Sequence, residues 1–138
     1  MTIHAYTDGA SRGNPGESAI GVILRDENGN TIRSYGKYIG TATNNIAEYT
    51  ALLACLSSVQ ETECHHLILH TDSELMARQL SGRYRVKDPA LKGLFEKAQE
   101  YLRGAKHTFE IRHVVRGQNN EADELANRSL NLKRSIET

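Results

Sequence analysis

Hydrophobic and polar residues alternate along the first part of the chain with the two-residue period of β-strands. The first strand is predicted to begin at Ile3 and to end at Asp8-Gly9. The glycine-rich stretch that follows is interpreted as a flexible loop. Two further strands lie on either side of an Asn-Gly turn, a strong hairpin signal, and cover residues 18–25 and 31–39. The chain is therefore expected to begin with three antiparallel strands.

The second part of the chain changes to the spacing of apolar positions that is typical of amphipathic helices. The first helix is predicted to start with Asn45 as its N-cap. A fourth strand, which is apolar, then runs from Leu67 to Asp72. Like the strand that begins at Ile3, it ends in Thr-Asp. Two helices are expected next, over residues 73–80 and 90–102. A last strand over residues 108–115 and a final helix that starts after Asn120 complete the chain.

This order of elements predicts an α/β fold. Three antiparallel strands followed by two strands that are each reached through helices form a five-stranded mixed sheet, because long helical connections favour parallel pairing. Helices are expected on both faces of the sheet. A length of 138 residues matches one domain. We expect a single domain over residues 1–138, with residues 131–138 as a candidate flexible tail.

Charge is distributed unevenly along the chain. The 17 Lys and Arg residues balance the 17 Asp and Glu residues, which excludes a uniformly basic nucleic-acid binder. Residues 1–77 contain 4 basic and 9 acidic side chains, whereas residues 78–106 contain 8 basic and 3 acidic ones. An acidic region beside a basic one suits a partner that carries phosphate groups, and a solvated basic helix also explains the second stretch by itself.

The sequence contains no feature that points to a membrane. No apolar run is long enough to span a bilayer, and the N-terminus lacks a secretion signal. The two cysteines are expected to be free thiols. These features predict a cytoplasmic protein without a membrane partner, and we expect a monomer.

Four acidic residues stand at strand ends or in first helical turns, namely Asp8, Glu48, Asp72 and Asp123. Each has a purely structural explanation, because acids at these places serve tight turns, N-caps and capping boxes. Taken together, the four acids instead favour one shared site. If the two Thr-Asp strands are neighbours, the helix starts bring all four acids to one edge of the sheet.

Carboxylates crowded in this way repel one another, and some protonate unless a cation neutralises them. Oxygen ligands of this kind favour Mg²⁺ or Mn²⁺. Two such ions about 4 Å apart can activate a water molecule and stabilise the leaving oxygen of a phosphodiester. The acidic residues therefore predict metal-dependent phosphodiester chemistry.

Four segments resemble the motifs of type 1 ribonuclease H, in the family's order and over nearly the whole chain. They are Tyr-Thr-Asp-Gly-Ala-Ser with Gly-Asn-Pro-Gly, Thr-Asn-Asn-Ile-Ala-Glu, His-Thr-Asp-Ser and Asn-Glu-Ala-Asp-Glu-Leu-Ala, at residues 6–11, 13–16, 43–48, 70–73 and 120–126. The segment Leu80–Leu94 is similar to the shorter bacterial and archaeal members. The resemblance implies a ribonuclease H-like fold, in which the first Thr-Asp strand is central.

The resemblance also implies an activity, the endonucleolytic hydrolysis of the RNA strand of an RNA–DNA hybrid, which leaves a 5′-phosphate and a 3′-hydroxyl. The implied ligands of two Mg²⁺ ions, with Mn²⁺ as a substitute, are Asp8, Glu48, Asp72 and Asp123. Positions that contact the minor groove are matched by Asn14, Asn44 and Asn45, and amides can read a ribose 2′-hydroxyl. Helix capping also explains Asn44 and Asn45. Thr43 matches a position that contacts a DNA phosphate. Candidate backbone contacts, also explained as solvated surface charge, are Arg83, Arg85 and Lys87.

The chain departs from the family pattern in two places. Many members carry a histidine in the loop before the last motif, and residues 116–122 contain none. In the family this histidine is thought to assist product release or proton transfer. Here Arg116, Gln118 or Asn119 replaces it, or the step goes unassisted, which would affect the turnover rate more than the presence of activity. The tryptophan-rich basic protrusion of some members is also missing, so modest affinity for hybrids is expected.

Two other functions stay open. One is a non-catalytic nucleic-acid-binding module on the same fold, which is disfavoured because binding alone does not need four carboxylates. The other is a related metal-dependent nuclease that acts on another duplex, such as double-stranded RNA.

Overall fold

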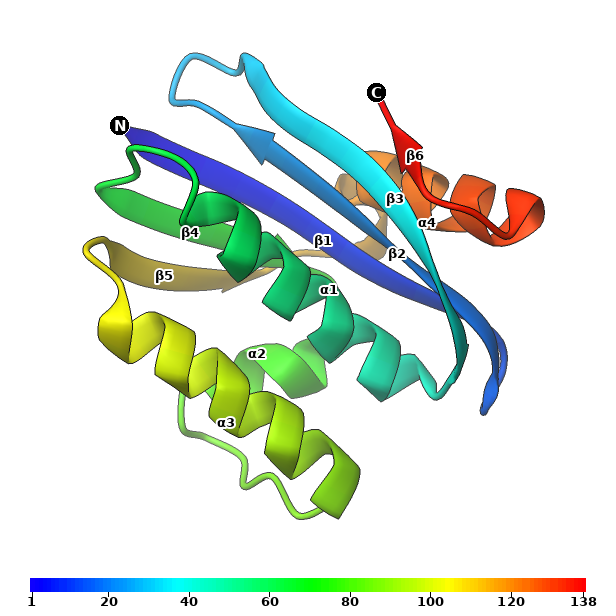
Figure 1. Cartoon of the computed structure of the whole chain (residues 1–138). Coiled ribbons are helices and arrows are strands. Elements are labelled where there is room, and N and C mark those ends of the chain that lie inside the picture. Colours follow the sequence, from blue (N-terminus) through cyan, green and yellow to red (C-terminus); the bar gives the residue numbers. More distant parts are fainter.

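We describe a computed structural model of the chain, which covers the backbone of residues 1–138 and every side chain except that of Arg116. The elements are β1 (Thr2–Gly13), β2 (Gly16–Arg25), β3 (Thr31–Ala42), α1 (Asn44–Val59), β4 (His66–Thr71), α2 (Glu74–Leu80), α3 (Pro89–Gly104), β5 (Thr108–His113), the short 3-10 helix η1 (Arg116–Gln118), α4 (Asn120–Leu132) and β6 (Ile136–Glu137). Figure 1 shows their arrangement.

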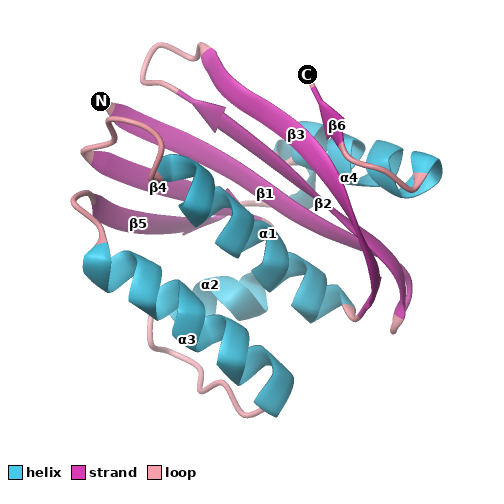
Figure 2. Ribbon diagram, viewed as in Figure 1, coloured by secondary structure: helices cyan, strands magenta, loops and turns pink.

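The strands form one mixed sheet in the order β5-β4-β1-β2-β3-β6. β1, β2 and β3 pair antiparallel, whereas β1 pairs with β4, and β4 with β5, in parallel. The predicted fold class, with three antiparallel strands followed by two parallel ones, is confirmed. Figure 2 shows α1, α2 and α3 on one side of this sheet and α4 on the other, as expected.

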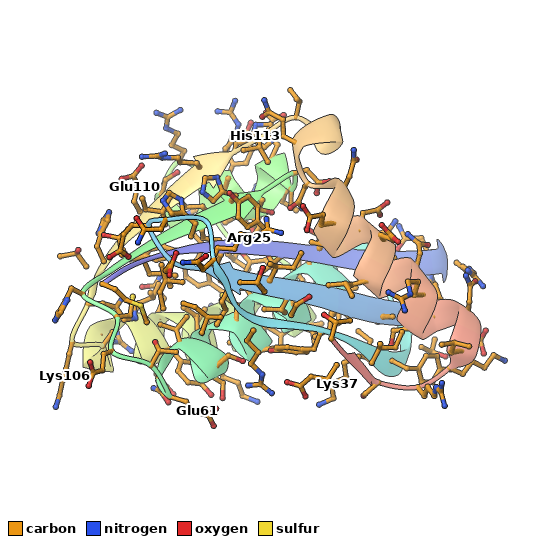
Figure 3. All side chains as sticks on the ribbon, turned by 90° about the horizontal axis from the view of Figure 1, so that it is seen from above. Arg25, Lys37, Glu61, Lys106, Glu110 and His113 are labelled. Atoms are coloured by element: carbon orange, nitrogen blue, oxygen red, sulfur yellow. The ribbon has the colours of Figure 1, made fainter. Side chains whose placement is uncertain are left out.

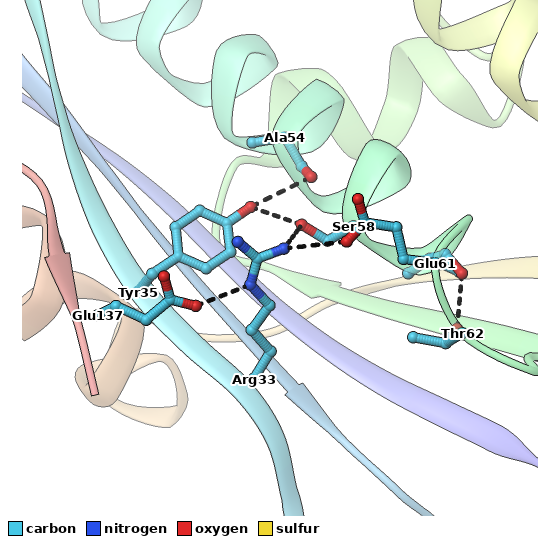
Figure 4. Close-up of polar contacts among 8 residues, drawn as sticks. Arg33, Tyr35, Ala54, Ser58, Glu61, Thr62 and Glu137 are labelled. Carbon is cyan, nitrogen blue, oxygen red and sulfur yellow. Dashed lines mark hydrogen bonds and ion pairs between the residues drawn. The ribbon is translucent and has the colours of Figure 1, made fainter.

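The predicted number of five strands was wrong, because Ile136 and Glu137 add a short sixth strand beside β3. Figure 4 shows the side chains near this edge. Arg33 of β3 donates to the Glu137 carboxylate, with an Nε to Oε1 distance of 3.0 Å, and to the Ser58 hydroxyl of α1. Its guanidinium also lies over the ring of Tyr35, 4.6 Å from the centroid. This contact network joins the end of the chain to the sheet, which no local sequence pattern indicates.

The first strand also differs from its prediction. β1 does not end at Asp8-Gly9, because its ladder with β2 continues to the pair Gly13 and Gly16. The stretch interpreted as a loop is therefore the far end of a long hairpin. Backbone hydrogen bonds to β2 hold it, and they outweigh the weak strand propensity of its glycine and serine residues.

The main core lies between the sheet and α1 with α3. Tyr49, Leu52 and Leu56 of α1 are buried against Ile3 and Ala5 of β1. Each large apolar side chain buried in this way contributes about 1.5–3 kcal/mol. α3 packs on the outside of α1, so that α1 is buried between two layers and its position along β1 is fixed.

α4 packs on the opposite face, across β1, β2 and β3. Its close approach depends on two glycines that pair with each other, Gly21 of β2 and Gly36 of β3. A Cβ atom at Gly21 would lie 2.1 Å from the carbonyl oxygen of Ala122, and one at Gly36 would lie 2.6 Å from that of Leu125. Side chains at these positions would therefore push the helix away from the sheet.

We predict that Gly21→Ala destabilises the protein by about 2–3 kcal/mol, because the added methyl group meets helix backbone that cannot move aside without repacking. Urea denaturation monitored by circular dichroism measures this change. Gly93→Ala is the matched control, because Gly93 lies in α3 with no atom near its Cβ position. There the same substitution is expected to be neutral or stabilising by up to about 1 kcal/mol. Equal effects at both sites would contradict the account of α4 packing.

Candidate active site

The first two acidic residues are aligned by parallel strand pairing. Tyr6 of β1 pairs with His70 of β4, and Asp8 and Asp72 follow two residues farther along their strands. Asp8 is still within β1 and only 5% exposed, whereas Asp72 follows the end of β4 and is half-buried. The two Thr-Asp strands are therefore neighbours at the centre of the sheet, as predicted.

Glu48 reaches the same place from α1. Its Oε1 atom accepts a hydrogen bond from the backbone N–H of Gly9, at 2.5 Å. A Cβ atom at Gly9 would lie 2.5 Å from the carbonyl carbon of Ala47, so that only glycine allows the first turns of α1 to pack on β1 at this point. Because Gly9 has no side chain, α1 can approach β1 closely enough for the Glu48 carboxylate to reach the strand.

Asp123 is delivered by the first turn of α4. The buried Asn119 side chain precedes this helix and donates from Nδ2 to the carbonyl oxygen of Thr7, at 2.7 Å. This bond ties the start of α4 to the residue before Asp8. One turn later, Asn127 donates to the Asp123 carboxylate at 3.2 Å, and Asp123 in turn contacts the Asp8 carboxyl group through a hydrogen bond.

The structure decides between the capping and clustering explanations at the helix starts. The N-cap of α1 is Thr43, whose hydroxyl accepts from the N–H of Ile46, so the prediction of Asn45 as N-cap was wrong. Ser73, rather than Asp72, caps α2. Because Glu48 accepts from Gly9, it faces β1. Glu48 and Asp72 are therefore not needed as caps.

The carboxylate oxygens of Asp8, Glu48 and Asp72 lie within 4.8 Å of one another, with one oxygen counted for each residue. They open into a cavity of about 480 Å³, which is also lined by Ser11, Asn44, Asp123 and Asn127. All three grouped ligands are hard oxygen donors, which fits Mg²⁺ or Mn²⁺ rather than a softer metal. The site thus has the composition that a divalent cation needs.

Electrostatics supports the same interpretation. The pKa of Asp8 is raised to about 10, first by burial, then by the charge of Glu48, by hydrogen bonds to Asp123 and Glu48, and by the charge of Asp72. Without a cation, this carboxyl group therefore keeps its proton at neutral pH. A divalent ion among these oxygens would reverse the balance and favour the ionised form.

Several predicted substrate contacts lie beside this cavity. Asn14, at the tip of the β1–β2 hairpin, accepts from the N–H of Asn44 through its Oδ1 atom, at 3.1 Å. Asn44 and Asn45 are exposed at the start of α1, next to the half-buried Thr43. The hairpin tip and the helix start therefore form one continuous edge next to the carboxylates.

The three predicted basic contacts lie on the segment between α2 and α3. The side chains of Arg83, Arg85 and Lys87 are exposed. The buried Gln79 side chain accepts from the Tyr49 hydroxyl at 2.6 Å and donates to the carbonyl oxygen of Arg85 at 3.5 Å. This link from α1 was not predicted, and it holds the backbone of the basic segment.

Comparisons with known proteins agree with this geometry. The family model described as "Reverse transcriptase-like" matches residues 6–129. The chain belongs to the type 1 ribonuclease H family. It is 43% identical over 128 residues to the protein named Ribonuclease HI of Halobacterium salinarum, a match that covers 93% of this chain and 64% of that protein. The chain thus spans about two thirds of the length of this curated relative.

Two solved ribonucleases H share the fold over nearly their whole chains. The crystal structure of RNase H1 from Halobacterium salinarum superimposes with a TM-score of 0.90 at 42% identity, covering 95% of this chain and 98% of that one. LC11-RNase H1, isolated from compost by a metagenomic approach, superimposes with a TM-score of 0.91 at 39% identity, with the same coverage, and was solved in complex with an RNA/DNA hybrid. Ribonucleases H depend on metal ions, and the acidic cluster matches that dependence.

The residues considered for the family's loop histidine have different surroundings. Asn119 is buried and bound to Thr7, so it holds α4 in place rather than reaching toward solvent. Gln118 is exposed. The side chain of Arg116 lies outside the described residues.

In the part of the chain that the structure describes, no helix is both long and apolar enough to cross a membrane. Both cysteines are free, and both are buried.

We predict that Asp8→Asn stabilises the metal-free protein at pH 8. The native Asp8 carboxyl binds its proton up to about pH 10, whereas the unfolded one releases it near pH 4. Between these values the native state binds more protons, so the free energy of unfolding falls as the pH rises. Asparagine cannot ionise and removes this loss. In EDTA, the Tm of the variant should exceed that of the wild type by a few degrees at pH 8, and the difference should shrink toward pH 5.

The matched control is Asp88→Asn at the exposed N-cap of α3, where asparagine caps as well as aspartate and the Tm should not change. Excess Mg²⁺ should raise the Tm of the wild type more than that of Asp8→Asn. A wild-type protein that gains stability from pH 5 to pH 8 more steeply than the Asp8 variant would contradict this account.

Proposed function

We propose that the protein is an endonuclease that hydrolyses the RNA strand of RNA–DNA hybrids and leaves 5′-phosphate and 3′-hydroxyl ends. The observation that carries this proposal is the convergence of Asp8, Glu48 and Asp72 beside the exposed amides of Asn14 and Asn44. Carboxylates alone would fit many metal sites. Amides next to them provide a means to recognise ribose. The name of the Halobacterium relative and the hybrid in the LC11-RNase H1 complex support the same substrate.

In this proposal the four carboxylates hold two Mg²⁺ ions, and Mn²⁺ can replace them. The bound ions would supply an activated water molecule and would neutralise charge on the leaving 3′-oxygen. Asp8 lies at the centre of the group, in contact with Glu48 and Asp123. Its burial at the sheet centre keeps its position fixed, which is the preorganisation that metal ligands need.

The amide edge next to the carboxylates would select the substrate. The Asn44 side chain lines the cavity, and Asn45 follows it at the exposed start of α1. Amides both donate to and accept from a 2′-hydroxyl, which distinguishes RNA from DNA. The Thr43 hydroxyl already accepts from Ile46, so its own proton remains available for a phosphate oxygen.

The basic segment would bind the backbone of the hybrid. Arg83, Arg85 and Lys87 are exposed on the connection that the Gln79 side chain holds, and they supply positive charge outside the acidic cavity. Contacts of this kind contribute affinity that is independent of sequence and falls with salt. Action as a monomer in the cytoplasm stays a prediction.

We predict that the protein cleaves the labelled RNA strand of an RNA–DNA hybrid in the presence of Mg²⁺ or Mn²⁺. Matched double-stranded RNA and double-stranded DNA should be cut at least ~100-fold more slowly, because a contact built for a substrate hydroxyl rejects a strand that lacks or misplaces it. Gel electrophoresis beside 5′-phosphate and 3′-hydroxyl markers measures both the rate and the chemistry of the ends.

Asp8→Asn should abolish cleavage, because it removes a central ligand charge while it keeps the shape of the side chain. Lys106→Ala is the control for general handling, since Lys106 is exposed in the connection between α3 and β5, away from the cavity. A folded wild-type protein that binds hybrids but cuts none of the duplexes would favour a binding module. Equal cleavage of double-stranded RNA would favour the broader nuclease.

A further inference from the structure

The last of the four acids, Asp123, lies at the edge of the carboxylate group. Among the side chains that the structure describes, the acids whose oxygens lie within 4.8 Å of one another are Asp8, Glu48 and Asp72. Asp123 contacts the Asp8 carboxyl group through a hydrogen bond and is half-buried in the first turn of α4. A carboxylate at the edge of such a group needs a further contact if it is to keep one orientation.

Asn127 supplies such a contact from one turn later on the same helix. Its Nδ2 atom lies 2.9 Å from the backbone carbonyl oxygen of Asp123 and 3.2 Å from the Oδ1 atom of the Asp123 side chain. A backbone carbonyl can only accept hydrogen bonds, so the NH₂ end of the Asn127 amide faces Asp123. The amide therefore joins the Asp123 carboxylate to the backbone of its own helical turn.

The side of α4 that carries this pair faces the acidic cavity. Figure 3 shows α4 crossing β1, the strand that holds Asp8, and β2. Asp123 and Asn127 both line the cavity of about 480 Å³, together with Asn44 from α1. Asn127 is half-buried within the helix, although asparagine is a weak helix former that favours caps and turns. An amide at this position is better explained by the site than by helix propensity.

We propose that Asn127 is a positioning residue of the metal site, which fixes the Asp123 carboxylate beside Asp8 for the ion that Asp123 helps to bind. The inference rests on the proposed function, because it takes Asp123 as a metal ligand. A ligand that is already oriented loses less freedom when an ion binds, so that the affinity for the ion rises. The amide is also neutral, so that it orients the carboxylate without repelling a cation as Lys or Arg would.

The alternative role of Asn127 is purely local. Asparagine side chains bond to the backbone of the preceding turn, and polar pairs four residues apart support a helix. A local role would change the stability of α4 and leave the affinity for metal ions as it is. Metal binding, measured without any nucleic acid, therefore separates the two roles, and this measurement does not depend on nuclease activity.

The test is a titration of the whole protein with Mn²⁺, in which electron paramagnetic resonance of the free ion gives the dissociation constant of each binding step. Asp123→Asn identifies the step to which Asp123 contributes. Asn127→Leu, which keeps the size of the side chain and removes its donor, should weaken that step about 10-fold, and Asn127→Ala should do the same. In the Asp123→Asn background, Asn127→Leu should cause no further loss, because Asn127 acts through Asp123.

Asn131→Leu is the matched control, because Asn131 lies one turn farther along α4, where it is exposed and accepts a hydrogen bond from Arg12. This variant should bind Mn²⁺ as the wild type does. Thermal unfolding of each variant in EDTA checks that the fold is intact. Unchanged Mn²⁺ affinity in the folded Asn127 variants, or losses from Asp123→Asn and Asn127→Leu that simply add, would overturn the role of Asn127 and leave the proposed function standing. Unchanged affinity in Asp123→Asn would overturn both this role and the proposed assignment of Asp123 as a metal ligand.

Discussion

The Asp8 carboxyl group is buried at the centre of the sheet, in contact with the carboxyl groups of Glu48 and Asp123 and near that of Asp72. Burial and like charge both oppose its ionisation, and for this reason its pKa is raised to about 10. Crowding acids in this way is electrostatically unfavourable, and a divalent cation bound among them would relieve it. The crowding that keeps Asp8 protonated, and so lowers the stability of the metal-free protein as the pH rises, would therefore favour the binding of a cation.

The rest of the fold holds these acids in contact by allowing helices unusually close to strands. On one face, Gly9 lets α1 pack against β1 and bring Glu48 to the strand. On the other face, the paired Gly21 and Gly36 let α4 approach β2 and β3, while Asn119 ties its start to Thr7. Two helices from opposite faces therefore reach one point on β1. The site depends on the missing side chains of three glycines as much as on the carboxylates.

Much of this architecture follows from local patterns. The two Thr-Asp strands, the hairpin and the amphipathic helices are visible in the sequence, and the parallel pairing of β1 with β4 explains why Asp8 and Asp72 meet. The strand β6 and the extension of β1 to Gly13 could not be predicted, because cross-strand hydrogen bonds create them against weak local propensity. The Asn119 and Gln79 contacts were also missed, since each joins segments that are distant in the sequence or hidden in the core. Local patterns thus identified the acidic residues that meet at the site, whereas the contacts that hold them in place arise from the tertiary structure.

The central claim is that the carboxylates of Asp8, Glu48 and Asp72 form a divalent-cation site. Anomalous X-ray diffraction from crystals of the protein soaked in Mn²⁺ tests it most directly, because manganese scatters anomalously and protein oxygens do not. The account predicts an anomalous peak among these three carboxylates, at Mn–O distances of roughly 2.0–2.6 Å, the range of the hard cations Mg²⁺ and Ca²⁺. The claim would be contradicted if Mn²⁺ gave a peak elsewhere in the crystal and none among the three carboxylates, while these carboxylates kept their contacts.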